Sequence, residues 1–190
     1  MYYYRELTLL PDADVTVNFL WTKLFCQVHY ALVEGKKIRP DMNIGCTWPD
    51  YTEEKLGNTL RLITDTRKDL ELLPLEKRLT RYRDYCHITS VRPVGERRIQ
   101  GYAVYRRYQP DGAVNSKARR FVKRHPEISL DEASHLLKQK KRKYLPFIQL
   151  KSDSTGQQFS LFIEKETSVP EVKAPFSTYG LSTCASLPEF

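Results

Sequence analysis

The fold is decided by a stretch in which the spacing of apolar residues changes from that of a strand to that of a helix. This stretch is residues 3–35, YYRELTLLPDADVTVNFLWTKLFCQVHYALVEG. Tyr3 to Leu9 alternates like a strand and stops at Pro11. From Val17 to Val33 the apolar residues recur at helical spacing, and Gly35 supplies a C-terminal stop. A strand followed by an amphipathic helix predicts a mixed α and β unit.

The same succession of strand and helix patterns continues to about residue 91. The sequence predicts strands at 44–48 and 59–64, a mostly helical stretch at 70–85 interrupted near Pro74, and a strand at 86–91. The resulting order, βαββαβ, is that of a ferredoxin-like fold. We therefore expect an α+β domain over residues 1–95, although this fold by itself does not indicate a function.

The second half of the chain has a different pattern. Its predicted elements are a strand at 99–109, a turn at Pro110-Asp111-Gly112, a basic helix at 115–125, a further helix from 129 to about 143, strands at 147–150 and 158–164, and a last short strand at 176–181. Ser129 and Glu132 form a capping box for the further helix. The strands on either side of loop 151–157 form a hairpin. Because the pattern of elements changes after about residue 95, we expect a second domain over residues 96–190.

Composition excludes several classes of protein. Hydrophobic residues make up 41% of the 190 residues and aromatic residues 12%, which is enough for a core and excludes global disorder. No apolar run approaches the roughly 18 residues of a membrane-spanning helix, and Met1 to Glu6 lack the apolar centre of a signal peptide. The cysteines form no CxxC pair, so neither a zinc site nor a disulfide framework is expected. We expect a soluble, cytoplasmic protein with no membrane partner.

The formal net charge of +8 points to a polyanionic partner. Residues 1–91 carry 13 basic and 13 acidic side chains, residues 92–143 carry 15 and 5, and residues 144–190 carry 3 and 5. The whole excess therefore lies in the middle segment. This distribution is typical of a nucleic-acid binder with a localised contact region, and by itself it fits double-stranded DNA as well as RNA.

A basic helix carries the clearest part of this charge. At about 100° per residue, an arc of roughly 160° holds Lys117, Arg119, Arg120, Lys123 and Arg124, and the opposite side holds Ala118, Phe121 and Val122. The planar fork of arginine bonds phosphate oxygens in pairs, so this face suits a phosphate backbone. A solvated helix face is the alternative. His125, which closes the helix before Pro126, either caps it or touches phosphate.

Three other positions have side chains suited to recognition or catalysis. Arg107 and Gln109 are two residues apart in a predicted strand, so both point to one face. Arginine matches the O6/N7 edge of guanine and glutamine the N6/N7 edge of adenine, although such a pair is common in strands. His29 lies at the border of the apolar stripe of the first helix. Imidazole changes charge near neutral pH and suits proton transfer, and a purely structural histidine is the alternative.

The loop KSDSTGQ at 151–157 is dense in hydroxyl groups and hydrogen-bond donors. Such loops bind phosphate or ribose, or simply turn a hairpin. The sequence contains no GxxxxGK[ST] motif and no carboxylate cluster for two metal ions. We therefore expect neither a metal-dependent nuclease nor a cofactor.

Several segments resemble the type I-F CRISPR repeat-processing endoribonucleases, which cut precursor CRISPR RNA at each repeat hairpin. In the family's order they are LLPD at 9–12, residues 24–33 around His29, IGCTWPD at 44–50, the basic helix ending at 124–125, LPF at 145–147, SDSTGQQF at 152–159 and YGLS at 179–182. These segments span nearly the whole chain. The 152–159 loop together with the late YGLS is the most specific part of the resemblance.

The resemblance implies a ferredoxin-like first domain and a second, distorted α+β domain that carries an arginine-rich helix. It implies metal-independent cleavage of precursor CRISPR RNA at the 3′ base of the repeat stem-loop, beside a guanine, leaving a 2′,3′-cyclic phosphate and a 5′-hydroxyl. The enzyme would stay bound to the mature guide RNA among the other subunits of a type I-F surveillance complex. That complex would serve either immunity or RNA-guided transposition.

The resemblance also assigns catalytic roles to three residues. His29 would be the proton acceptor, Ser152 would hold the attacking 2′-hydroxyl, and Tyr179 would orient His29. RNA cleaves itself once its 2′-hydroxyl is deprotonated in line with the phosphate, so positioning by the protein supplies much of the catalysis.

The remaining carried-over residues would bind the RNA. Phe159 would stack under the terminal base pair, and Arg107 and Gln109 would read guanine and adenine. The groove-binding helix would contribute Arg119, Arg120, Lys123 and Arg124, and the hydroxyls near the scissile phosphate would be those of Ser154 and Thr155. Lys123 stands where the family typically has arginine, which reduces a paired phosphate contact to a point charge.

Two other functions fit parts of the sequence. A non-catalytic hairpin-binding subunit would cap the guide RNA, but the joint presence of His29, Ser152 and Tyr179 favours the enzyme. A generic double-stranded DNA binder would leave the 152–159 loop unexplained.

Overall fold

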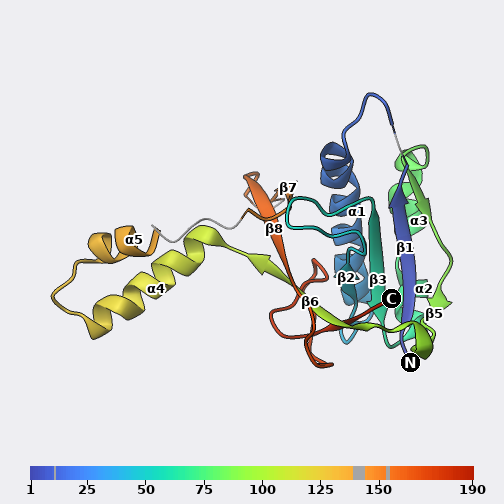
Figure 1. Ribbon diagram of the computed structural model, residues 1–190. Helices are drawn as coiled ribbons and strands as arrows, with labels where there is room; N and C mark the ends of the chain where they lie inside the picture. The colour runs from blue at the N-terminus through green and yellow to red at the C-terminus, as the bar shows by residue number, and fades with distance from the viewer. Residues whose placement is uncertain (11, 139–143, 153–154) are drawn as a thin grey trace.

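The computed structural model describes residues 1–10, 12–138, 144–152 and 155–190, which Figure 1 shows as a ribbon. The first half of the chain forms an antiparallel sheet in the order β2-β3-β1-β4, and β5 also pairs with β1. Its strands are β1 (Tyr3–Leu9), β2 (Gly45–Thr47), β3 (Thr59–Thr64), β4 (Cys86–Ile88) and β5 (Arg92–Pro93). This strand order, with helices after β1 and after β3, confirms the predicted ferredoxin-like fold.

The helices of the first half are α1 (Val17–Ile38), α2 (Arg67–Leu72) and α3 (Leu75–Leu79), followed by a 3₁₀ turn at Thr80–Tyr82. Helix α2 packs on β1 and β3, and α3 packs against α1. Pro74 separates α2 from α3, as predicted, because proline cannot continue the helical hydrogen-bond ladder. The hydroxyl of Thr16 caps α1 by accepting a bond from the Phe19 N–H at 3.4 Å.

The prediction that α1 ends at Gly35 is wrong. The helix continues to Ile38, and Gly35 lies where α1 passes very close to two other side chains. A Cβ at this position would lie 2.5 Å from Met42 Sδ and 2.9 Å from Leu73 Cδ2. Glycine allows Met42 and Leu73 to pack closely against the helix here, and the linear pattern alone does not distinguish that role from a helix stop.

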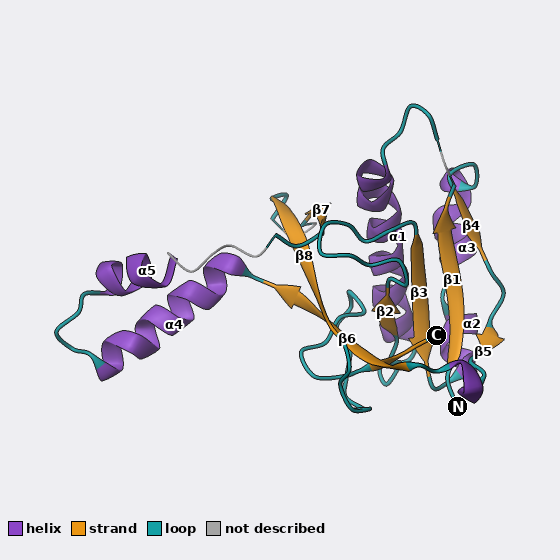
Figure 2. Cartoon of the chain, in the orientation of Figure 1, coloured by secondary structure: helices purple, strands orange, loops and turns teal. Residues whose placement is uncertain are grey.

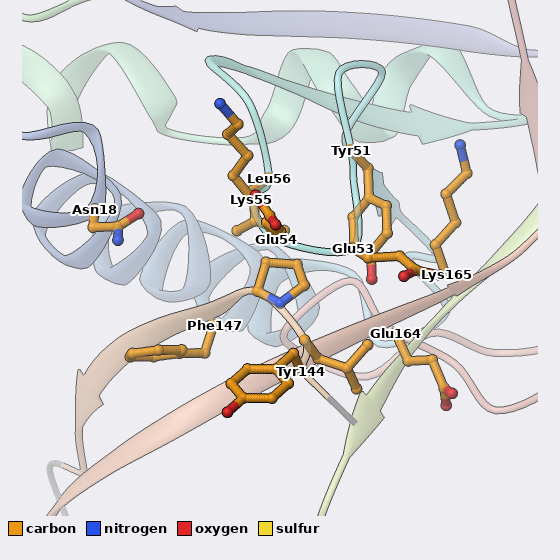
Figure 3. A pocket seen from close by; sticks show the side chains of 12 residues that line it. Asn18, Tyr51, Glu53, Glu54, Lys55, Leu56, Tyr144, Phe147, Glu164 and Lys165 are labelled. Atoms are coloured by element: carbon orange, nitrogen blue, oxygen red, sulfur yellow. The ribbon is translucent and has the colours of Figure 1, made fainter. Parts of the chain in front are cut away.

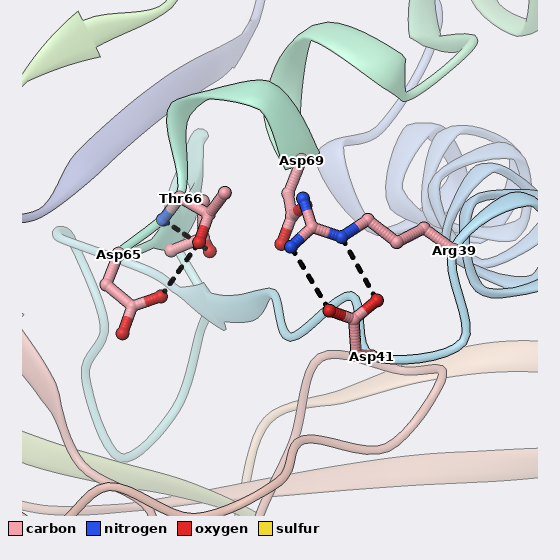
Figure 4. Close-up of polar contacts among 6 residues, drawn as sticks. Arg39, Asp41, Asp65, Thr66 and Asp69 are labelled. Carbon is pink, nitrogen blue, oxygen red and sulfur yellow. Dashed lines mark hydrogen bonds and ion pairs between the residues drawn. The ribbon is translucent and has the colours of Figure 1, made fainter.

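Arg39, directly after α1, ties the end of this helix to α2. Its guanidinium donates to the two carboxylate oxygens of Asp41 at 3.0 and 3.1 Å and pairs with Asp69 at 2.8 Å (Figure 4). Burial raises the pKa of the Asp69 carboxyl, and the charge of Arg39 opposes this effect. The cluster fixes the chain at the end of the helix that carries His29.

The second half forms another antiparallel sheet, in the order β7-β8-β6-β9. After a 3₁₀ turn at Glu96–Arg98, its strands are β6 (Gly101–Tyr108), β7 (Phe147–Lys151), β8 (Gln158–Glu166) and β9 (Leu187–Glu189). The predicted β7–β8 hairpin is confirmed. One buried cluster contains Trp21 and Leu60 together with Tyr105 and Leu161, so side chains from both halves share a core.

The predicted strand at 176–181 is wrong. This segment is a turn in which Gly180 has a φ of +67°, a left-handed conformation that interrupts an extended strand. The last strand is instead β9, which pairs with residues 101–103 of β6. Pro188 is accommodated in β9 because this strand lies at the edge of the sheet.

Between β6 and β7 the chain forms a helical arm, which consists of α4 (Pro110–Arg124) and α5 (Leu130–Lys138). The two helices pack against each other and extend away from both sheets (Figure 2). The predicted turn at 110–112 is wrong, because α4 begins at Pro110. The fixed φ of proline suits the first helical position, where no N–H is needed.

The capping box that opens α5 is confirmed. The Ser129 hydroxyl accepts a bond from the Glu132 N–H at 3.2 Å, and the Ser129 N–H donates to the Glu132 carboxylate at 3.0 Å. The pKa of the Glu132 carboxyl is lowered by the bond from the Ser129 N–H and by a second bond, at 2.9 Å, that the Ser129 hydroxyl donates to the carboxylate. The predicted end of this helix, near residue 143, lies outside the described residues.

Candidate active site

A pocket of about 240 Å³ is lined by residues from α1, the end of β7 and the C-terminal turn. It brings together His29, Ser152 and Tyr179, the three residues to which the family resemblance gives catalytic roles. The rest of the lining consists of Cys26, Tyr30, Leu150 and Lys151. Residues that are far apart in the sequence therefore meet at one place.

His29 is half-buried and is held by a backbone group of the C-terminal turn. Its Nδ1 lies 2.8 Å from the carbonyl oxygen of Thr178. Because a carbonyl can only accept a hydrogen bond, Nδ1 carries the hydrogen, and in the neutral ring Nε2 is then the basic nitrogen. The imidazole is thus set up to accept a proton at Nε2.

Tyr179 supplies a second contact to the same imidazole. The two rings are stacked, with centroids 4.1 Å apart and planes 8° from parallel. The turn that carries Tyr179 is closed by a bond from the Gly180 N–H to Ser177 and is anchored to β2 by a bond from the Cys46 N–H to Gly180, at 2.9 and 2.8 Å. The turn therefore contacts the imidazole of His29 through both a carbonyl and an aromatic ring.

Ser152 lies at the start of the loop between β7 and β8. Its N–H donates to Gln157 at 2.8 Å, and its carbonyl accepts from Gly156, which has a φ of +69°. Its hydroxyl accepts a bond from the Thr155 N–H at 3.3 Å. These bonds form a compact turn that holds the Ser152 hydroxyl at the pocket. Thr155 is exposed, and Ser154 lies outside the described residues.

Phe159 and Arg107 lie next to this group of rings. Phe159, on β8, is half-buried, and its ring centroid is 6.5 Å from that of Tyr179 in an edge-on arrangement. The guanidinium carbon of Arg107 lies over the Phe159 ring, 5.2 Å from its centroid. Arg107 is exposed, whereas its neighbour Arg106 pairs with Glu164 and Glu166 at 2.8 and 2.9 Å. Strand alternation thus puts Arg106 and Arg107 on opposite faces, with Arg106 in ion pairs and Arg107 exposed.

Gln109 follows β6 and is the cap residue of α4. Its backbone is extended, with a φ of −123° and a ψ of 97°, and the residue is exposed. An extended backbone preserves the alternation that puts Gln109 on the side of Arg107. The two residues to which the sequence gives a base-reading role therefore stay together where the arm begins.

The basic face of α4 is exposed as predicted. The exposed residues are Lys117, Arg119, Arg120, Lys123 and Arg124, whereas Ala118 is buried and Phe121 and Val122 are half-buried. Helix α4 packs against α5, and both helices extend away from the sheets (Figure 2). The His125 N–H caps the helix by donating to Phe121 at 2.9 Å, and its ring lies near Glu127. The arm therefore carries its exposed charge outside both sheets.

Sequence reasoning missed several residues around the pocket. Thr178 contributes a backbone carbonyl, which leaves no side-chain signal in a sequence. Cys26 and Tyr30 lie on the same helix as His29, and the spacing of Cys26, three residues earlier, could have indicated that it shares the helix face.

The structure also contains a larger cavity, of about 750 Å³, between the 51–56 segment, α1 and residues 144–147 (Figure 3). Its lining includes the acidic residues Glu53, Glu54 and Glu164 and the basic residues Lys55 and Lys165. None of the predicted site residues lines it, so volume alone does not identify the candidate active site.

Among the residues that the structure describes, no three histidine, cysteine or carboxylate side chains gather in an arrangement that could hold a metal ion. In that same part of the chain, none of the helices combines the length and apolar character required to cross a membrane.

Comparison with known proteins gives consistent matches. The family model described as CRISPR-associated protein (Cas_Csy4) matches residues 4–190. The chain is 35% identical over 194 residues to the CRISPR-associated endonuclease Cas6/Csy4 of Escherichia coli (strain UTI89 / UPEC). It is 32% identical over 195 residues to the CRISPR-associated endonuclease Cas6/Csy4 of Pseudomonas aeruginosa (strain UCBPP-PA14). Each alignment covers 100% of this chain and 100% of the relative.

Proposed function

The chain belongs to the Cas_Csy4 family of CRISPR-associated proteins, as its sequence resemblance indicates, and on this premise we propose that it is an endoribonuclease that processes CRISPR RNA. Its substrate is precursor CRISPR RNA, cut at the 3′ base of the repeat stem-loop. The observation that carries the proposal is the convergence of His29, Ser152 and Tyr179 on one pocket. Two of its relatives are named endonucleases, which supports an enzyme over a passive hairpin binder.

The reaction that suits this pocket is attack by the substrate's own 2′-hydroxyl. Nε2 of His29 accepts the hydroxyl proton, and the 2′-oxygen forms a bond to phosphorus as the bond to the 5′-oxygen breaks. The leaving oxygen takes up a proton, so the products are a 2′,3′-cyclic phosphate and a 5′-hydroxyl. Ser152 fixes the ribose, and Tyr179 with the Thr178 carbonyl keeps the imidazole in line.

The RNA-binding residues lie beside and beyond the pocket. Phe159 stacks under the terminal base pair, and Arg107 and Gln109 read bases near the foot of the stem. Thr155 and Ser154 contribute hydroxyls near the cut. The exposed cations of α4 bind phosphates along the stem, which fits an A-form groove too deep and narrow for ordinary side-chain reading.

The partners follow from the same proposal. The enzyme keeps its hairpin product and joins the other subunits of a type I-F RNA-guided complex in the cytoplasm. A second candidate function, a non-catalytic subunit that only caps the guide RNA, is favoured by the size of the exposed basic face alone.

The test measures binding and cleavage of the same repeat hairpin in excess EDTA. We expect wild-type cleavage to persist, because the proposed reaction uses only side chains and the substrate hydroxyl. His29→Ala should bind the stem nearly as tightly while cleavage falls roughly 10²- to 10⁴-fold. His87→Ala is the matched control, since His87 is exposed on β4, outside the pocket.

A hairpin with a single 2′-deoxyribose before the cut should bind and remain whole. Cleavage of that substrate, or cleavage by His29→Ala at the wild-type rate, would contradict the mechanism. A wild-type protein that binds the hairpin but never cuts it would leave the capping subunit as the function.

A further inference from the structure

Phe159 links the base-reading side of the site to its catalytic side. The guanidinium of Arg107 lies over the Phe159 ring, the Phe159 ring lies against Tyr179, and the Tyr179 ring is stacked on His29. The separations along this series are 5.2, 6.5 and 4.1 Å. The four side chains therefore form one unbroken series of ring contacts.

The two contacts of the Tyr179 ring differ in geometry. Its stack on His29 is nearly parallel, at 8°, whereas its contact with Phe159 is nearly perpendicular, at 81°. Edge-to-face contact is a favourable arrangement for two aromatic rings at this separation. The Tyr179 ring therefore has an aromatic neighbour on each of two sides, His29 and Phe159, and Phe159 restricts the space into which the ring can move.

Phe159 is well suited to hold a neighbouring ring still. It lies on β8, where it pairs with Leu150 of β7, and it packs against the buried core. Tyr179, in contrast, lies in a turn rather than in a strand. The β7–β8 hairpin thus contacts the Tyr179 side chain directly, in addition to the backbone bonds that hold the turn.

We propose that Phe159 is a positioning residue for His29 and acts through Tyr179. This inference rests on the proposed function only in taking His29 as the proton acceptor. It adds that the side chain under the terminal base pair also sets the imidazole that makes the cut. Loss of the Phe159 ring should therefore impair the cleavage step even where RNA is fully bound.

The first experiment examines the full-length protein without RNA. Histidine labelled with ¹⁵N reports, by NMR, which imidazole nitrogen of His29 carries the hydrogen and how uniform that state is. We expect wild type and Phe159→Tyr to show hydrogen at Nδ1. Phe159→Leu and Tyr179→Leu should both shift and broaden the His29 signals, which His29→Ala assigns by their loss.

Phe147→Leu is the matched control. Phe147 lies in the same hairpin and contacts Phe162, with ring centroids 5.3 Å apart, so its loss removes an aromatic pair elsewhere in the hairpin. It should leave the His29 signals unchanged. Thermal unfolding of Phe147→Leu, Phe159→Leu and Tyr179→Leu shows whether the three variants remain folded to the same extent.

The second experiment measures single-turnover cleavage at saturating protein. Phe159→Leu should lower this rate about two- to tenfold, which is the factor that corresponds to the loss of one aromatic pair. Phe159→Tyr, which keeps the ring, should restore the rate. Unchanged His29 signals in Phe159→Leu, with moved signals in Tyr179→Leu, would overturn the inference. Failure of the proposed function is a separate result, because the NMR comparison uses no RNA and does not depend on cleavage.

Discussion

Gly180 approaches Cys46 so closely that no larger residue fits between the C-terminal turn and β2. A Cβ on Gly180 would lie 2.3 Å from Cys46 Sγ, and the Gly180 carbonyl accepts the Cys46 N–H at 2.8 Å. This contact holds the turn that carries Tyr179 and the Thr178 carbonyl, and both of these groups contact His29.

Gly180→Ala should therefore impair catalysis. The left-handed backbone costs alanine about 1–2 kcal/mol, and the overpacked contact with Cys46 adds about 1–3 kcal/mol, which displaces the turn. We expect single-turnover cleavage to fall while stem binding is retained. Gly101→Ala is the control, because a Cβ there meets no atom within 4 Å. Equal cleavage by the two variants would show that the turn does not position His29.

The exposed face of α4 should bind RNA mainly through phosphates. Arg119→Ala with Arg120→Ala should weaken binding and flatten the slope of log K against log salt by up to about 0.9 for each phosphate that is no longer neutralised. The control pair is Arg81→Ala with Arg83→Ala, two exposed arginines of the first half. The slope is measured by fluorescence anisotropy over a salt series. An unchanged slope in the α4 variant would show that α4 does not contact RNA phosphates.

Arg106 and Arg107 are neighbours with opposite expected effects. Arg107→Ala should cost about 1–3 kcal/mol of discrimination at one stem base pair, because its paired bonds to guanine can no longer form. Arg106→Ala should instead lower thermal stability, since it removes a partner from the buried Glu164. Binding constants for hairpins with each terminal base pair separate the two effects. Equal weakening for every stem sequence would make Arg107 a phosphate contact.

The pair of Arg5 and Glu76 should make stability depend on pH. A hydrogen bond from the buried Arg5 lowers the pKa of the Glu76 carboxyl. Its contribution is therefore complete above the ordinary pKa of glutamate and is lost as the pH falls through the lowered value. Glu76→Gln should destabilise the protein near neutral pH by about 1 kcal/mol or less, because the carboxylate is largely exposed.

In thermal unfolding, the difference between wild type and Glu76→Gln should shrink as the solution is acidified. Glu71→Gln is the control, since Glu71 pairs with the exposed Arg67 on the surface of α2. A difference that grew at low pH would contradict the sign of the effect.

The spacing of apolar residues predicted those strands and helices whose buried face can be recognised within the element itself. The bounds of β1 and β3 are as predicted, and so is the start of α1 at Val17, because burial of one face is encoded by spacing alone. Gly35 and Gly180 are different. One permits close helix packing and the other a left-handed turn, and both requirements come from distant neighbours.

The candidate site shows the same division. Strand alternation predicts that Arg107 and Gln109 share one face, and helical periodicity predicts the basic face of α4. That Ser152 and Tyr179 lie beside His29 is expected only from the family resemblance, because no spacing rule relates segments so far apart. The Thr178 carbonyl has no sequence signal at all.

The arm formed by α4 and α5 has a consequence for how such an enzyme can be altered. Its apolar faces close on each other, and its capping box stabilises α5 locally. Residues of the arm can therefore be exchanged with little disturbance to the core that surrounds His29. In engineering terms the arm is a replaceable part: exchanging it should change how tightly a stem is held, whereas the proposed choice among stems, made by Arg107 and Gln109, should be retained.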